Sequence, residues 1–139
     1  MTIADMVEAK GWPFFRTLEK DVIRELSEQT DSVIAPGGGA VMDGDNVARL
    51  RQRGIFVLLT ADMDVLARRI EADQTSAEKR PPLLEGTLRR ELQRLLAERM
   101  PIYKELSQVT VDTSNRSIDE VVTRILGHLE SQTNETPSM

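Results

Sequence analysis

The sequence between residues 32 and 41 is Ser32-Val33-Ile34-Ala35-Pro36-Gly37-Gly38-Gly39-Ala40-Val41. Its short apolar start predicts a buried β-strand, and three consecutive glycines follow. Because glycine has no side chain, a ligand can approach the backbone of such a segment closely. In open α/β sheets, ligands bind beyond the carboxyl ends of the strands, where this segment would lie. We therefore predict that the glycine triplet is the floor of a substrate site; the alternative is an ordinary flexible turn.

Strands and helices alternate along the rest of the chain. Apolar residues at helical spacing predict a helix over about residues 14–29, and the run Ile55–Leu59, apolar on both faces, predicts a covered parallel strand. Three further helices are expected, one that begins at Asp62, one over residues 87–99 and one that begins at Ser117. A third strand is expected at Val109–Val111. This order predicts an α/β fold in which helices sandwich a parallel sheet.

Local signals predict where the elements begin and end. They are a capping box at Thr2 and Asp5 with Gly11 as a stop, a chain break at Trp12-Pro13, Asp45 as the cap of a short helix that Gly54 ends, Pro101 as a kink or an end, and a capping box at Ser117 and Glu120. We expect one domain over residues 1–130. The polar segment 72–86 is long for a connection and is expected to be either a mobile functional loop or a disordered insertion, and residues 131–139 are expected to form a disordered tail.

The composition narrows the classes of function. The net charge is −5, so no overall basic field favours nucleic acid or an acidic membrane surface. The chain has no cysteine, which excludes disulfides and thiolate metal sites, and its single histidine, His128, is expected to face solvent rather than bind a metal. The sequence contains no apolar run long enough to span a membrane and no signal peptide core, so a cytoplasmic location is expected.

Several arginines are candidates for binding an anionic ligand. Arg16 lies at a predicted helix start, where a cation opposes the helix dipole, so an anionic ligand or Glu19 one turn later would offset it. Arg80 lies in the loop before Pro81-Pro82 and Arg99 at a helix end, and one of the pair Arg68-Arg69 should face solvent. Each arginine alone could be surface charge. Several around a glycine floor indicate a substrate with carboxylate or phosphate groups.

Five segments together carry a family resemblance that covers Thr2 to about Leu129. They are Phe15-Arg16 with Leu18-Glu19, Ala35-Pro36-Gly37-Gly38-Gly39-Ala40-Val41, Arg80-Pro81-Pro82-Leu83, Arg99-Met100-Pro101-Ile102-Tyr103 and Val111-Asp112-Thr113. In this order and spacing, the chain resembles shikimate kinase. The resemblance implies a P-loop-kinase-type fold and the reaction of ATP, with Mg²⁺, and shikimate to shikimate 3-phosphate, a step of aromatic amino-acid biosynthesis.

The resemblance also implies roles for particular residues. Arg16 and Arg99 would bind the carboxylate of shikimate. The glycine triplet would hold the ring hydroxyls through Gly37, Gly38 and Gly39. Residues 72–86 would be the lid of the family, and its catalytic arginine, Arg80, would close over the phosphates of ATP. The nucleotide base would lie between Arg68 and the loop Asn115-Arg116-Ser117, where Arg116 is the candidate.

One family motif does not occur in the sequence. No G-x-x-x-x-G-K-[ST] segment is present, and the family's first strand, P-loop, following helix and second strand would precede Met1. Phosphoryl transfer depends almost wholly on positioning and electrostatics. We therefore expect that the chain is truncated at its N-terminus and that it is impaired in catalysis on its own. We also expect that its own residues form no metal site.

Two alternative functions remain open at this point. One is another P-loop small-molecule kinase, such as a gluconate kinase, although Arg16 and Arg99 around a glycine triplet favour a cyclic hydroxy-carboxylate. The other is a non-catalytic domain that binds shikimate or quinate, which the missing motif favours.

The resembled topology implies an exposed sheet edge. The family's first strand would lie between the Val33-Ile34 strand and the strand at Ile55–Leu59, so both would have an unpaired inner edge. Unpaired strand edges pair readily with other chains. We expect the chain to be oligomeric, molten or prone to aggregation.

Overall fold

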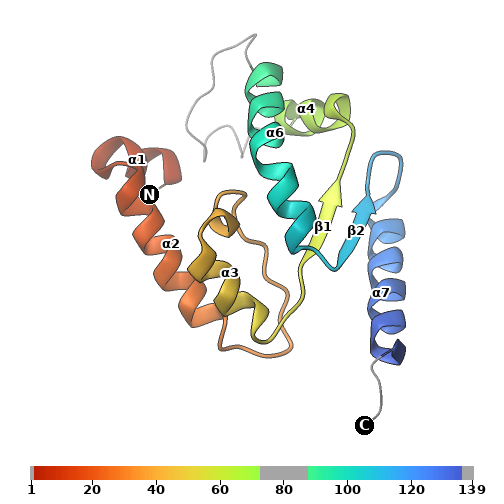
Figure 1. Ribbon diagram of the computed structural model, residues 1–139. Helices are drawn as coiled ribbons and strands as arrows, with labels where there is room; N and C mark the ends of the chain where they lie inside the picture. The colour runs from red at the N-terminus through yellow and green to blue at the C-terminus, as the bar shows by residue number, and fades with distance from the viewer. Residues whose placement is uncertain (1, 73–87, 136–139) are drawn as a thin grey trace.

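The computed structural model describes residues 2–72 and 88–135, with side chains as far as residue 131. Its elements are α1 (Ile3–Lys10), α2 (Trp12–Leu26), the 3-10 turn η1 (Ala40–Met42), α3 (Gly44–Arg51), β1 (Val57–Thr60), α4 (Met63–Ala72), α6 (Leu88–Leu106), β2 (Val109–Asp112) and α7 (Ile118–Glu135). Figure 1 shows α2 and α3 on one side of the sheet strand β1 and α7 beside β2. The predicted lid, Arg80 included, lies outside the described residues except for Ala72 at the end of α4.

The two strands form a parallel pair. β1 and β2 run in register from Val57 opposite Val109 to Thr60 opposite Asp112, and the connection between them contains α4 and α6. The pairing continues one residue further, where the backbone N–H of Thr113 donates to the carbonyl of Thr60 over 2.7 Å. A parallel strand pair needs such a long helical crossover. The predicted α/β class with a parallel sheet and flanking helices is confirmed.

The predicted strand at Val33-Ile34 does not form. Residues 32–37 have no regular secondary structure, and Val33 is fully exposed. A strand is stabilised by hydrogen bonds to a neighbouring strand, and among the described residues only β1 and β2 pair with each other. The sheet of the described residues therefore has two strands rather than the expected three. The prediction that β1 is covered on both faces is also wrong, since Leu59 remains 52% exposed.

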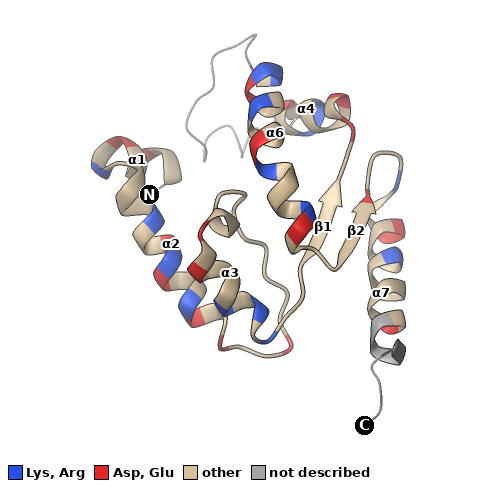
Figure 2. Cartoon of the chain, viewed as in Figure 1, with Lys and Arg blue, Asp and Glu red and all other residues tan. Residues whose placement is uncertain are grey.

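Charged side chains are concentrated on the helices and connecting segments (Figure 2). β1 carries none, and β2 carries only Asp112 at its end. The inward residues of β2, Val109 and Val111, are almost completely buried. The strands thus form the apolar centre, while the charged groups available for chemistry lie at their ends and on the helices.

A small core fixes the segment that follows the glycines. Val41 of η1, Val47 of α3 and Leu106 of α6 form a buried cluster, against which Phe56 and Tyr103 pack. Burial of such side chains is the main stabilising contribution in a domain of this size. The cluster therefore holds the end of the glycine triplet between α3 and α6.

Two predicted helix starts need correction. The capping box of Thr2 and Asp5 forms as expected, but α2 begins at Trp12 rather than about Phe14 and ends at Leu26 rather than Gln29. A proline in the first helical turn is tolerated because its missing N–H has no partner there in any case. The cap of α3 is Asp43, whose side chain accepts from the N–H of Asp45 over 2.8 Å, and not Asp45 itself.

Two predicted helix ends also need correction. Pro101 does not end α6, which continues to Leu106, so Arg99 and Tyr103 lie one turn apart on the same helix. The C-terminal helix α7 begins with the predicted Ser117–Glu120 capping box but extends to Glu135, so the expected tail is helical over residues 131–135. His128 is exposed, as expected.

The apolar face of α7 is only partly buried. Val121, Ile125 and Leu129 are partly covered, whereas the exposed fractions of Ile118, Val122 and Leu126 are 82%, 46% and 53%. Within residues 2–72 and 88–135, no helix combines the length and the hydropathy that crossing a membrane requires.

Candidate functional site

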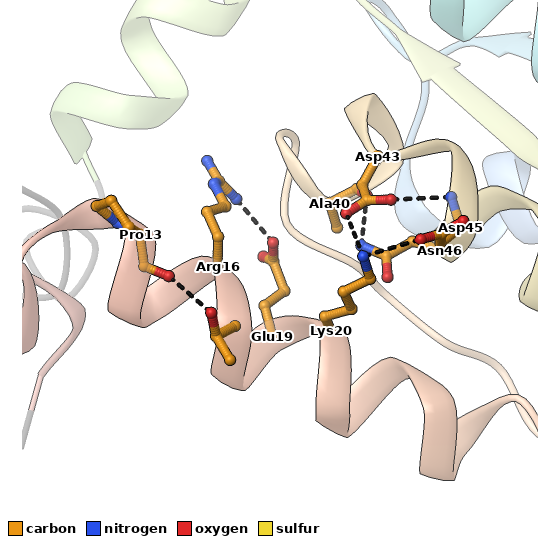
Figure 3. A network of polar contacts seen from close by, with 9 residues as sticks. Pro13, Arg16, Glu19, Lys20, Ala40, Asp43, Asp45 and Asn46 are labelled. Carbon is orange, nitrogen blue, oxygen red and sulfur yellow. Dashed lines mark hydrogen bonds and ion pairs between the residues drawn. The ribbon is translucent and has the colours of Figure 1, made fainter.

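Helix α2 places Arg16 and Glu19 beside the glycine triplet. The two side chains lie one turn apart, and the guanidinium of Arg16 donates to a carboxylate oxygen of Glu19 over 2.8 Å (Figure 3). The side chain of Glu19 is only 12% exposed. The guanidinium carbon of Arg16 also lies 5.3 Å from the ring centres of both Trp12 and Phe15. Arg16 is therefore held by one carboxylate and two aromatic rings.

The three carbonyl groups of the triplet are all occupied by protein donors. Gly37 accepts from the N–H of Ala40 over 3.0 Å, and Gly39 accepts from the N–H of Met42 over 3.2 Å. Gly38 accepts from the hydroxyl of Tyr103 over 2.6 Å. The amide N–H groups of the triplet donate to no described residue. The triplet therefore presents hydrogen-bond donors, which suit oxygen atoms of a ligand.

The space beside the glycines is filled by the side chains predicted for the site. A Cβ atom on Gly38 would lie 2.9 Å from the hydroxyl of Tyr103 and 3.0 Å from a guanidinium nitrogen of Arg99. A Cβ atom on Gly39 would lie 2.8 Å from the guanidinium carbon of Arg16. The structure thus brings Arg16 and Arg99, which are far apart in the sequence, to adjacent residues of the triplet.

The charges at this site do not cancel. Glu19 offsets the charge of Arg16, whereas Arg99 forms no ion pair with any described residue. The site as described has two guanidinium groups and one carboxylate, and it carries a net positive charge although the whole chain is acidic. This arrangement favours a ligand with a carboxylate or phosphate group.

A polar network anchors the residues that follow the triplet. Lys20 of α2 forms ion pairs with Asp45 over 2.9 Å and Asp43 over 3.3 Å. Asn46, only 2% exposed, donates to the carbonyl of Ala40 over 2.8 Å (Figure 3). These contacts join α2, η1 and α3, and so they hold Arg16 and the triplet in one frame.

The network also shifts the pKa values of its charged groups. Hydrogen bonds to Asp45 and then Asp43 raise the pKa of Lys20. The pKa of Asp43 is lowered, mainly because its carboxylate accepts from the N–H of Asp45 and to a lesser extent because Lys20 lies beside it. The ionised forms of both groups are therefore the ones that this fold stabilises.

A second group of cations lies at the carboxyl end of β2. Arg69 donates to the hydroxyl and the carbonyl of Thr113 over 2.8 and 2.9 Å, and Arg116 donates to the carbonyl of Asp112 over 2.6 Å. The pKa of Asp112 is lowered, first by the N–H and hydroxyl of Ser114 and then by the two arginines. Two guanidinium groups are thus held beside the same loop.

Arg68, the candidate chosen from the sequence, does not reach this loop. Its only contact among the described residues is with the carbonyl of Asp64 on its own helix, and it is exposed. Adjacent residues on a helix point about 100° apart, so only one of the pair can face β2. The structure brings Arg69, rather than Arg68, together with Arg116.

Sequence reasoning misses part of the first site. It leaves Tyr103 in a motif without a role, and it treats Glu19 only as an ion-pair partner, which the structure confirms. The spacing in the sequence could have indicated both residues, because Tyr103 lies four residues after Arg99 and Glu19 lies three residues after Arg16, which places each pair on one face of a helix. For Tyr103 this spacing is not used, because Pro101 is expected to kink or end the helix.

Comparisons with known proteins identify the family of this chain. The family model described as shikimate kinase matches residues 1–130. The shikimate kinase of Syntrophus aciditrophicus is 41% identical over an alignment 139 positions long, gaps included, which covers 94% of this chain and 71% of that protein. The solved shikimate kinase of Acinetobacter baumannii in complex with shikimate has a TM-score of 0.85 at 32% identity, covering 98% of this chain and 73% of that one. The Aquifex aeolicus enzyme has a TM-score of 0.76 at 31% identity, covering 96% and 74%. The chain shares the P-loop-kinase-type fold of these enzymes, and it belongs to the shikimate kinase family.

Proposed function

We propose that Arg16, Arg99 and the glycine triplet bind shikimate, the substrate that this family phosphorylates. The observation that carries the proposal is the position of two guanidinium groups, from α2 and α6, directly against Gly39 and Gly38. A relative of this fold was solved in complex with shikimate, which supports the same ligand here. The family match also favours this substrate over gluconate.

The donors of the site match the acceptors of shikimate. Its carboxylate would be bound by the guanidinium groups of Arg16 and Arg99, which can each form two parallel hydrogen bonds with a carboxylate. Its ring hydroxyls would accept from the amides of Gly37–Gly39, whose carbonyls are already occupied. Glu19 would keep Arg16 in the orientation that this geometry needs.

The nucleotide would lie at the second group of cations. Arg69 and Arg116 are held beside the loop after β2, and a planar guanidinium can stack on a purine base. When bound, ATP supplies the phosphoryl group, and we propose that Arg80 of the lid contacts its phosphates. Residues 2–72 and 88–135 contain no group of three or more side chains that could hold a metal ion, so we assign none of them to Mg²⁺.

Calorimetric titration with shikimate tests the proposal. A hydrogen bond to a charged group contributes about 1.5–3 kcal/mol, so Arg16→Ala and Arg99→Ala should each weaken binding by about 10- to 100-fold. Two exposed arginines on the same helices provide matched controls. Arg24→Ala removes an ion pair with Asp21 on α2, and Arg94→Ala removes one with Glu91 on α6. Both controls should bind like the wild type.

A ligand without the charge gives a second comparison. The methyl ester of shikimate should bind the wild type weakly, and the arginine substitutions should weaken its binding much less than that of shikimate. Trp12, the only tryptophan, lies against Arg16 and provides an independent fluorescence signal. Wild-type affinity for shikimate in either arginine variant would show that this arginine does not bind the carboxylate.

A further inference from the structure

Tyr103 and Arg99, one turn apart on α6, both lie beside Gly38. The hydroxyl of Tyr103 donates to the carbonyl of Gly38 over 2.6 Å, and the same hydroxyl and the guanidinium of Arg99 lie where a side chain of Gly38 would start. The hydroxyl of Tyr103 is the only side-chain group among the described residues that bonds to the backbone of the triplet. Its partner is the middle residue of the segment.

This bond constrains the direction of the next amide group. Described residues contain no cis peptide bond, so the N–H of Gly39 points opposite to the carbonyl of Gly38. A peptide unit between two glycines can rotate more easily than any other. Holding the carbonyl toward Tyr103 therefore keeps the N–H of Gly39 directed away from α6.

We propose that Tyr103 is a positioning residue for substrate binding, whose hydroxyl holds the carbonyl of Gly38 and thereby aims the N–H of Gly39 at one ring hydroxyl of the substrate. The inference rests on the proposed function, because it takes shikimate as the ligand of the triplet. It adds a residue that does not itself touch the substrate.

The ring and the hydroxyl of Tyr103 have separable roles. The ring packs against the buried cluster of Val41, Val47 and Leu106, whereas the hydroxyl reaches the triplet. Tyr103→Phe therefore keeps the packing and removes only the bond to Gly38. Ser107→Ala is the matched control, because the hydroxyl of Ser107, directly after α6, bonds to the carbonyl of Tyr103 and not to the triplet.

The test combines these variants with shikimate analogues that each lack one ring hydroxyl. Loss of a neutral hydrogen bond typically changes binding by about three- to tenfold. Tyr103→Phe should weaken shikimate binding by this factor, with only the small fall in melting temperature that the loss of one hydrogen bond causes. For the analogue that lacks the hydroxyl bound by Gly39, Tyr103→Phe should have no further effect. For the other analogues, Tyr103→Phe should still weaken binding by about three- to tenfold. Ser107→Ala should change none of these affinities.

Two results would overturn the inference. One is wild-type affinity for shikimate in Tyr103→Phe. The other is an equal loss for every analogue, which is expected if the hydroxyl only stabilises the fold.

A ligand-free measurement separates this inference from the proposed function. If the wild-type chain binds no shikimate, the proposed function fails, and nuclear magnetic resonance of the amide groups still tests Tyr103. In Tyr103→Phe the resonance of the Gly39 amide should shift or broaden, while that of Gly44, which the Tyr103 side chain does not contact, stays in place. An unchanged Gly39 resonance would show that the hydroxyl does not hold this peptide unit.

Discussion

At Gly38 and Gly39, glycine is required by space rather than by backbone conformation. Neither residue has a positive φ, which among the described glycines occurs only at Gly11. Instead, the guanidinium groups of Arg99 and Arg16 lie where Cβ atoms would be. From the sequence, the bare backbone is expected to admit a ligand. The structure adds that it admits the two arginines that would bind this ligand.

Gly38→Ala should therefore weaken shikimate binding more than it destabilises the fold. The new methyl group would displace the flexible end of the Arg99 side chain at small cost, and it would also press on the hydroxyl of Tyr103, whose ring packs against the buried cluster. With one charged and one neutral hydrogen bond disturbed, we expect at least about a tenfold loss of affinity. Calorimetry and thermal unfolding together measure both effects.

Gly44→Ala is the control, since no atom lies within 4 Å of the position that its new methyl group would take. It should change neither binding nor stability by much. A large fall in melting temperature for Gly38→Ala, with normal binding by the folded fraction, would show that the triplet is only a structural turn.

At the scale of elements, the start of α3 supports the site from outside. The carboxylate of Asp43 caps this helix and pairs with Lys20 of α2, and its pKa lies below the ordinary value of 3.8. A lowered pKa means that the carboxylate stabilises the fold above about pH 3.8, and that this contribution is lost as the pH falls through the lowered value.

Asp43→Asn should remove this pH dependence while leaving the cap in place, because asparagine is also a good N-cap residue. We expect a lower melting temperature than the wild type at about pH 6, with the difference shrinking toward about pH 3. Asp21→Asn, in an exposed pair on α2, provides the comparison. A constant difference in melting temperature over this range would contradict the role of the charge.

At the scale of the whole molecule, the sheet has an unprotected edge. β1 pairs with β2 on one side, and among the described residues no strand pairs with its other side. β1 carries no charged residue, and Leu59 and the nearby Ile55 are half exposed (Figures 1 and 2). Natural sheet edges are usually protected by charges, prolines or covering elements.

A polypeptide of residues 1–139 should therefore self-associate through this edge. Leu59→Lys should increase its monomer fraction, because a charge at an edge strand opposes pairing. Leu126→Lys, on the exposed face of α7, tests the other apolar surface and should have little effect. Size-exclusion chromatography with light scattering measures the fraction, and a wild-type monomer with a sharp two-state melt would contradict the prediction.

The sequence by itself determined the features that depend on neighbouring residues. The capping boxes at Thr2 and Ser117 involve side chains three residues from the groups they bond, so local spacing was sufficient. The α/β class followed from the alternation of apolar strands with amphipathic helices. The resemblance in five segments selected Arg16, Arg99 and the triplet, which the structure then places together.

Only the tertiary structure decided the features that depend on distant partners. The apolar run at Val33-Ile34 is not a strand, because a strand forms only where another strand pairs with it. Arg69 rather than Arg68 bonds to Thr113 after β2, because the rotation of α4 against β2 is set by packing. Tyr103 reaches Gly38 because α6 continues through Pro101, whose unfavourable effect on a helix is offset by the buried contacts of that last turn. Local patterns cannot contain these contacts, since each joins residues more than 40 positions apart in the chain.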